Sequence, residues 1–219
     1  MQTQRLIKFI RDLYNSKEII PLHEPFFNDE DKIKLTQTID STFVSSVGPL
    51  VGQFEEEIKN FTGAKYAVAV VNGTSALHVS LELVGVQPGD EVLTQSLTFV
   101  ASTNAINLCK AVPVFIDVSR QTLGMCPDSL LDFLTQNCEL RDGFCFNKTS
   151  KKVVKACMPM HTFGFSCEID EIRSICNDFR IKLVEDSAES LGSFHESKHT
   201  GTFGDCGVLS FNGNKIITT

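Results

Sequence analysis

The sequence predicts an α/β fold built around a largely parallel (mixed) sheet. Two observations support this: short apolar runs of strand length alternate with segments of helical length, and polar residues follow directly after several of the apolar runs. Parallel strands need long crossover connections, which are usually helices. We therefore expect a three-layer sandwich with helices on both faces of the sheet, and a ligand site at the carboxyl ends of the strands.

The amino-terminal segment, residues 1–50, is predicted to be helical and extended, and residues 51–219 to form the α/β domain. Residues 1–14 form an amphipathic helix whose apolar positions are broken by charges, so we expect neither a signal peptide nor a membrane span. Residues 19–25 should be extended around two prolines. Asn28 should cap a helix over residues 29–41. A further helix is expected over residues 51–61, with Gly63 ending it.

The remaining elements alternate as the fold class requires. The run Ala67–Val71 is continuous and mostly β-branched, as in a strand covered on both faces. Residues 139–150 are polar with glycine and predict a loop. Further strands are expected at residues 91–94, 112–118, 153–160 and 181–186, and helices at 76–83, 98–107, 127–137 and 169–179.

Composition narrows the class of protein. A chain of 219 residues with 42% hydrophobic content can bury a sizeable core, and a net charge of −7 argues against nucleic-acid binding. Eight cysteines are scattered through apolar segments without a C-x-x-C pair, which favours reduced thiols in a cytoplasmic protein. His195 and His199 have helical spacing but lack a partner at a ligand interval, so we expect no metal site.

Three segments carry residue types that suit one cofactor. Asp186 ends an apolar strand, Ser210 and Lys215 follow the apolar pair Val208-Leu209, and Asn72-Gly73-Thr74-Ser75 joins a strand to a helix. Pyridoxal phosphate needs a lysine amine for its aldehyde, an aspartate for its ring nitrogen and donors for its phosphate. A helix amino terminus favours a phosphate, although each residue taken alone is also compatible with a solvated charge or an ordinary turn.

Four motifs occur in order: residues 72–77, 98–101, 185–189 and 210–215. Together they resemble the DegT/StrS family of pyridoxal phosphate-dependent sugar aminotransferases, and in particular its LegC-like branch. Residues 20–25 and 45–48 also look like that branch. The resemblance implies the large domain of the aspartate-aminotransferase-like fold (fold type I), with a smaller carboxy-terminal domain missing from this chain.

The resemblance also implies residue roles. Lys215 would be the catalytic residue, holding the cofactor as a Schiff base and moving the proton, and Asp186 would pair with the ring nitrogen. Many relatives have glutamine where this chain has Glu189, which would lie near the phenolic oxygen. The implied cofactor-binding set is Gly73, Thr74, Phe99, Asp186, Glu189, Ser210 and Lys215. From the residues alone, Phe99 is either a core residue or a lid over a planar ring.

By the same resemblance, the expected activity is transfer of an amino group from an amino acid, with glutamate as the expected donor, to a nucleotide-linked keto sugar. The product would enter polysaccharide or glycan synthesis, and the enzyme would be a cytoplasmic homodimer. Two alternatives stay open at this point. One is a truncated, non-catalytic cofactor-binding fragment or regulator. The other is a related sugar dehydratase, a group that generally has histidine where Lys215 stands.

Overall fold

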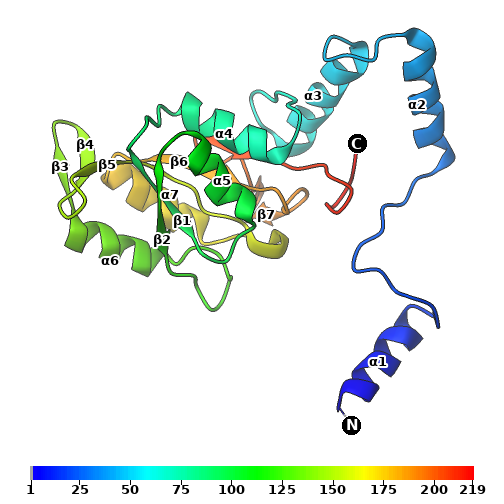
Figure 1. Ribbon diagram of the computed structural model, residues 1–219, viewed down its shortest axis with the longest axis horizontal. Helices are drawn as coiled ribbons and strands as arrows, with labels where there is room; N and C mark the ends of the chain where they lie inside the picture. Colours follow the sequence, from blue (N-terminus) through cyan, green and yellow to red (C-terminus); the bar gives the residue numbers. More distant parts are fainter. Residues whose placement is uncertain (1) are drawn as a thin grey trace.

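The computed structural model describes residues 2–219 (Figure 1). Its core is a mixed sheet in which β1 lies between β2 and β5, and β5 leads through β6 to β9. These pairs are all parallel, whereas β3 and β4 form an antiparallel extension beside β5. The strands are β1 (Glu91–Gln95), β2 (Val112–Ile116), β3 (Cys138–Arg141), β4 (Phe144–Asn147), β5 (Lys152–Cys157), β6 (Lys182–Asp186) and β9 (Cys206–Val208), with a separate hairpin of β7 (Phe194–His195) and β8 (Lys198–His199).

Helices cover both faces of this sheet, as the three-layer prediction requires (Figure 1). Their bounds are α1 (Gln2–Leu13), α2 (Asp29–Ser41), α3 (Pro49–Thr62), α4 (Gly73–Leu83), α5 (Val100–Leu108), α6 (Pro127–Asn137) and α7 (Ile169–Asp178). The short 3-10 turn η1 (Thr162–Gly164) follows β5. No helix among residues 2–219 is long and apolar enough to span a membrane.

Two buried cores lie on opposite faces of the sheet because successive strand residues point to opposite sides. The first core packs α4 and α5 on the sheet, and the second packs α6 and α7. Val92, Ala156 and Val184 belong to the first core, whereas their neighbours Leu93, Cys157 and Leu183 belong to the second. Apolar side chains at every strand position therefore indicate a sheet that is covered on both sides.

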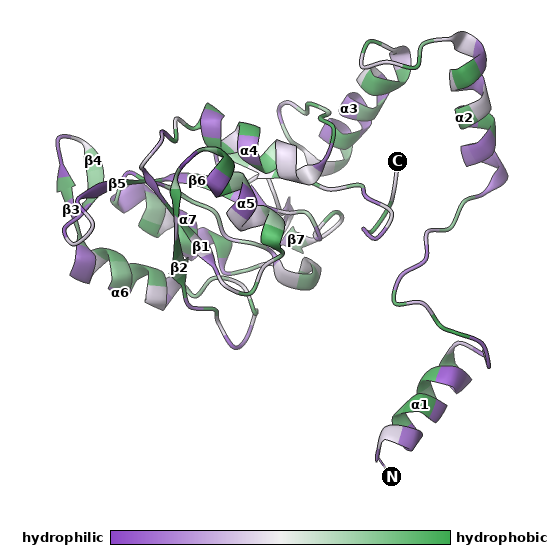
Figure 2. Cartoon of the chain, in the orientation of Figure 1, coloured by the Kyte–Doolittle hydropathy of each residue, from purple (hydrophilic) through white to green (hydrophobic). Residues whose placement is uncertain are grey.

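The amino-terminal arm, residues 2–48, extends away from this body (Figure 1). Asn28 caps α2 as predicted, because its Oδ1 accepts hydrogen bonds from the N–H groups of Glu30 and Asp31 at 2.8 and 3.1 Å. The arm leaves many apolar residues exposed, among them Leu22 at 106% and Phe26 at 87% (Figure 2). The helices of the arm are thus explained by helix capping and by the helical spacing of apolar residues, and not by packing against the α/β body.

The predicted strand at Ala67–Val71 is wrong in this structure. The run is extended but pairs with no strand among the described residues, and Val68 and Val71 are 79% and 86% exposed. Its one recorded backbone hydrogen bond runs from the Ala69 N–H to Glu55 Oε1 at 2.8 Å. A β-branched sequence becomes a strand only where another backbone supplies the ladder.

The predicted loop at residues 139–150 is also wrong, because it contains the β3–β4 hairpin. Arg141 pairs with Phe144, and the two residues between them, Asp142 and Gly143, have φ of 50° and 85°. Asp-Gly is a preferred pair for a two-residue hairpin turn with positive φ at both positions. The signal was present in the sequence, but the polar residues around it obscured the strands.

All eight cysteines are free, and six of them are buried: Cys109, Cys138, Cys145, Cys157, Cys167 and Cys176. Burial raises the pKa of the Cys167 thiol and that of Cys109, so both stay protonated near neutral pH. The predicted packing is confirmed for these six thiols, and their reduced state stays a prediction.

Candidate active site

The carboxyl ends of β6 and β9 and the amino termini of α4 and α5 meet on one side of the sheet. β6 ends at Asp186, Ser210 follows β9 by two residues, and Gly73 opens α4. A parallel sheet collects such chain ends at one edge, which is why residues far apart in sequence come together here. Lys215 reaches the same side of the sheet, and its ammonium acts against the rise in the pKa of Asp186.

Asp186 is 3% exposed and is held by two hydrogen bonds. Ser102 Oγ donates to Asp186 Oδ2 at 2.7 Å, and the Ala188 N–H donates to Oδ1 at 3.2 Å. Burial raises the pKa of Asp186, while Ser102, Ala188, Lys215 and His161 each act in the opposite direction. The carboxylate is therefore fixed in one orientation at a desolvated position.

Lys215 reaches the same region from the carboxy-terminal segment. Its Nζ lies 3.3 Å from Glu189 Oε1 and 6.0 Å from the centre of the Phe99 ring. Glu189 Oε2 also accepts the N–H of Phe163 at 3.2 Å. Because the Lys215 side chain is only 13% exposed, its amine is largely shielded from solvent while its charge faces a carboxylate and an aromatic face.

The strand-to-helix turn brings Gly73 against Ser210. A Cβ atom at Gly73 would lie 3.2 Å from both Cβ and Oγ of Ser210, so only glycine fits there without displacing the serine. Asn72 caps α4 by accepting the Ser75 N–H at 2.8 Å. Gly73 and Thr74 hold the first two positions of the helix, where backbone N–H groups have no partner within the helix. These N–H groups and the Ser210 hydroxyl can together bind an anion.

Glu185, the neighbour of Asp186, forms a second buried centre on the opposite face of β6. Its Oε2 lies 3.0 Å from His161 Nε2, and the N–H groups of Gly201, Phe203 and Gly204 donate to its two oxygens at 2.6 to 2.8 Å. Burial alone would raise the pKa of Glu185, but the hydrogen bonds from His161, Gly204 and Gly201 outweigh it and the pKa is lowered. Glu185 is thus an ionised anchor for the loop that leads to β9.

The tautomer of His161 follows from its other ring nitrogen. Nδ1 accepts the N–H of Cys167 at 3.3 Å, so the ring hydrogen sits on Nε2 and is donated to Glu185. The His161 N–H in turn donates to the Asp186 carbonyl at 3.1 Å. The turn after β5 and the end of β6 are therefore locked together, which holds Asp186 in place from behind.

Two contributors to the site were not predicted from the sequence: Ser102, and Glu185 as an anchor. Ser102 lies three residues after Phe99, so its spacing on the α5 helix was visible, but only the fold shows that this helix starts beside Asp186. In the sequence, Glu185 is visible only as part of a strand-end motif. Its role depends on N–H groups that lie 16 to 19 residues further along the chain.

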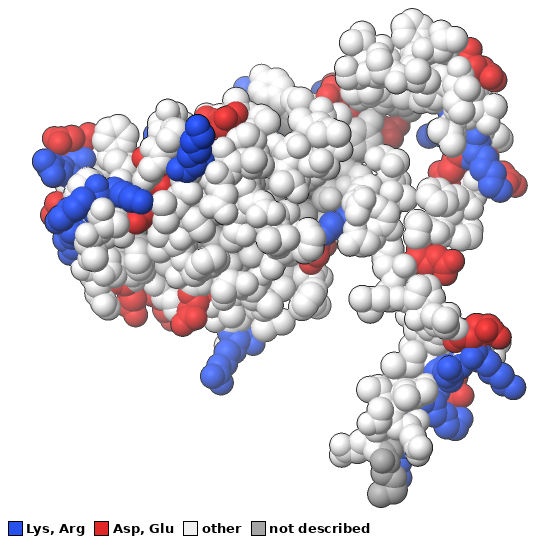
Figure 3. Space-filling model, in the orientation of Figure 1, with Lys and Arg blue, Asp and Glu red and all other residues white. Residues whose placement is uncertain are grey.

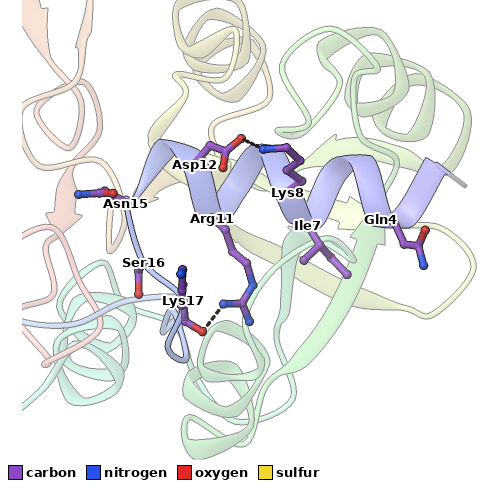
Figure 4. Close-up of a pocket in the computed structure, with 8 residues that line it drawn as sticks. All are labelled: Gln4, Ile7, Lys8, Arg11, Asp12, Asn15, Ser16 and Lys17. Atoms are coloured by element: carbon purple, nitrogen blue, oxygen red, sulfur yellow. Dashed lines mark hydrogen bonds and ion pairs between the residues drawn. The ribbon is translucent and has the colours of Figure 1, made fainter.

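Two hollows of the surface lie away from this site. One of about 580 Å³ runs along α1, lined by residues that include Ile7, Arg11 and Asn15 (Figure 4), and another of about 450 Å³ lies beside the start of α3. None of the seven predicted site residues lines either hollow. On the face drawn in Figure 3, charges gather near the β3–β4 hairpin and along α1 and α2, and the surface between them is mostly uncharged.

The residues present fit pyridoxal phosphate. The shielded Lys215 amine suits the cofactor's aldehyde, and the buried Asp186 carboxylate suits its ring nitrogen. The turn at Gly73, beside Ser210, suits its phosphate. No group of three or more metal-ligating side chains occurs among the described residues. The fold and this donor set define the class of fold type I pyridoxal phosphate enzymes.

Within that class, the chain belongs to the DegT/DnrJ/EryC1/StrS aminotransferase family, which it matches over residues 26–219. The family predicted from the four motifs is therefore confirmed. Because α1 precedes residue 26, it lies outside the matched region.

Relatives and solved structures agree with the family assignment. EpsN of Bacillus subtilis is 40% identical over 200 residues, which are 91% of this chain and 49% of EpsN. GDP-perosamine synthase of Caulobacter vibrioides is 34% identical over 91% of this chain and 50% of its own length. The crystal structure of an aminotransferase from Psychrobacter cryohalolentis superposes with a TM-score of 0.79 at 29% identity, covering 92% of this chain and 47% of that one. The chain thus spans about half the length of the relatives it matches.

Proposed function

We propose that the protein transfers an amino group from an amino acid to a nucleotide-linked keto sugar. The observation that carries the proposal is that a shielded Lys215 amine and a buried Asp186 carboxylate lie on the same side of the sheet, in a chain of a sugar aminotransferase family. The relative GDP-perosamine synthase, by its name, makes a nucleotide-linked sugar, which supports this substrate class.

Pyridoxal phosphate, when bound, supplies a carbonyl that joins to amines and a cationic ring that draws electrons from the reacting carbon. The protein's part is to place charge and protons around it. Asp186 holds a fixed negative charge for the ring nitrogen, since Ser102 and Ala188 orient both of its oxygens. Lys215 provides an amine that can bond to the carbonyl or carry a proton at Nζ.

The remaining residues bind and orient. The free N–H groups of Gly73 and Thr74 and the Ser210 hydroxyl would hold the phosphate, and the exposed Phe99 ring would cover one face of the cofactor ring. Glu189 holds the Lys215 amine at 3.3 Å and would lie beside the cofactor's phenolic oxygen. A carboxylate in place of an amide there keeps a negative charge next to Nζ.

The proposal also names the amino donor, the assembly and the compartment. Glutamate is the proposed donor and a homodimer the proposed assembly. The exposed apolar residues of the amino-terminal arm favour burial of that arm against another surface. Eight free thiols fit a reducing compartment such as the cytoplasm.

The test uses the whole protein, loaded with pyridoxal phosphate and incubated with glutamate and a panel of nucleotide-linked keto sugars. Mass spectrometry should detect an aminated nucleotide sugar and an equal amount of 2-oxoglutarate. Amination of free keto acids with no turnover of any nucleotide-linked sugar would contradict the proposed substrate class. Sedimentation of the same sample would show whether the protein is a dimer.

A further inference from the structure

A chain of hydroxyl groups leads from the start of α5 to the Asp186 carboxylate. Ser102 Oγ lies 2.7 Å from Asp186 Oδ2, and Thr98 Oγ1 lies 2.6 Å from Ser102 Oγ. Thr98 Oγ1 is also 3.0 Å from the sulfur of Met160. Ser102 is 1% exposed and Asp186 is 3% exposed, so water does not substitute for the contact between them.

The charge of Asp186 sets the direction of every hydrogen bond in this chain. An ionised carboxylate only accepts, so Ser102 must donate its one proton to Asp186. The 2.6 Å contact then requires Thr98 to donate to Ser102. If Asp186 is protonated and donates instead, the chain can reverse, with Ser102 donating to Thr98 and Thr98 to the Met160 sulfur.

The two directions differ in strength. The ionised arrangement ends on a carboxylate and contains charge-assisted hydrogen bonds, whereas the reversed one ends on a thioether, which is a weak acceptor. Ser102 also lies in the first turn of α5, whose positive end favours a negative charge. Both features favour the ionised form of a carboxylate that burial otherwise disfavours.

We infer that Ser102, aligned by Thr98, is a positioning residue that keeps Asp186 ionised and oriented toward the cofactor ring. The other groups that act on the charge of Asp186 are the Ala188 N–H, the Lys215 ammonium and, from the opposite face of β6, His161. Lys215 takes part in the reaction itself and cannot supply a constant charge. The Thr98–Ser102 pair, like the Ala188 N–H, does not take part in the reaction, and Ser102 makes the shorter of the two hydrogen bonds to Asp186. The predicted effect on kcat rests on the proposed function, whereas the predicted effect on the Asp186 titration does not.

The first measurement needs no cofactor. Carbon NMR of aspartate-labelled, cofactor-free protein would follow the Asp186 carboxyl, assigned through the loss of its signal in Asp186→Asn. Ser102→Ala should move the Asp186 titration to higher pH. Thr98→Val should move it less in the same direction, and Ser102→Thr, which keeps a hydroxyl, should restore it. Ser80→Ala is the matched control, since Ser80 is a buried serine of α4 that does not contact Asp186.

The second measurement uses the loaded enzyme. Ser102→Ala should lower kcat about tenfold at neutral pH with little change in KM, because one charge-assisted hydrogen bond is lost. The inference expects this loss in kcat to shrink as pH rises, because Asp186 then ionises without help from Ser102. A loss that grows with pH would contradict a role through Asp186. An unchanged Asp186 titration in Ser102→Ala would overturn the inference. A shifted titration in a protein that fails to aminate any sugar would support it and would count against the proposed function alone.

Discussion

Glu185 and Asp186 are adjacent carboxylates whose surroundings shift their pKa values in opposite directions. Glu185 faces the α6–α7 side of the sheet, where hydrogen bonds from His161, Gly204 and Gly201 lower its pKa. Asp186 faces the α4–α5 side, where burial outweighs its hydrogen bonds and the pKa is raised. Ionised Glu185 therefore stabilises the fold, whereas ionised Asp186 lowers the stability of the fold.

Glu185→Gln should destabilise the protein by about 3 kcal/mol, because an amide cannot accept from all four donors and leaves buried N–H groups unpaired. Urea unfolding of the cofactor-free protein at neutral pH would measure this loss. Glu82→Gln is a suitable control, since the Glu82 side chain is 61% exposed on α4. Equal stability of Glu185→Gln and wild type would show that the anchor has no energetic role.

The same pair of proteins has a defined pH dependence. A lowered folded-state pKa adds stability that is complete above the unfolded value of about 4.3 and disappears as pH falls through the folded value. The gap between wild type and Glu185→Gln should therefore be constant from pH 7 to about pH 5 and close in stronger acid.

Asp186→Asn should have the opposite effect on stability. A carboxyl with a raised folded-state pKa costs stability above that pKa, and the cost vanishes below the unfolded value of about 3.9. The variant should thus unfold at a higher urea concentration than wild type at pH 7, with a difference that shrinks in acid. Turnover should fall by about 100-fold, since the fixed charge at the ring nitrogen is gone. A less stable but fully active variant would refute both assignments.

Lys215→Ala should abolish covalent attachment of the cofactor and lower turnover by more than about 1000-fold, because the amine that bonds and carries the proton is lost. Absorption spectra of the loaded protein would report the attachment. Lys182→Ala is the matched control. Lys182 lies on β6, the same strand as Asp186, and its half-exposed side chain pairs with Asp205. If Lys215→Ala kept the visible absorption band of a cofactor bound to lysine as a Schiff base, the attachment would have to be at another lysine.

Gly73→Ala should weaken pyridoxal phosphate binding about tenfold, because the new Cβ lies 3.2 Å from Ser210 and must displace it. Equilibrium dialysis would give the affinity. The double variant with Ser210→Gly should remove the contact but also the hydroxyl, and so should not recover full affinity. Gly52→Ala should leave affinity unchanged and raise stability by about 0.5–1 kcal/mol, because Gly52 lies within α3 near its start and a Cβ there meets nothing within 4 Å.

Local sequence was sufficient for most elements and for the residues at their ends. Helical spacing, caps and apolar runs predicted α2, α6 and β6 nearly at their observed bounds, since these signals depend on neighbours a few residues apart. The order of strand, polar residue and helix also placed Asp186 and Lys215 on the same side of the sheet. The motifs identified the family because cofactor chemistry restricts which residue types can stand at those positions.

Long-range pairing decided the rest. The Ala67–Val71 run has strand composition but lies exposed, because a strand needs a partner that its own sequence does not specify. Residues 138–147 became a hairpin because β5 offers an edge to β4. The opposite environments of Glu185 and Asp186 cannot be seen in the sequence either. The groups that act on these two residues come from α5, from the turn that follows β5 and from the loop before β9. Sequence determined which residues stand at the strand ends, and the tertiary structure determined the electrostatic surroundings that each of them meets.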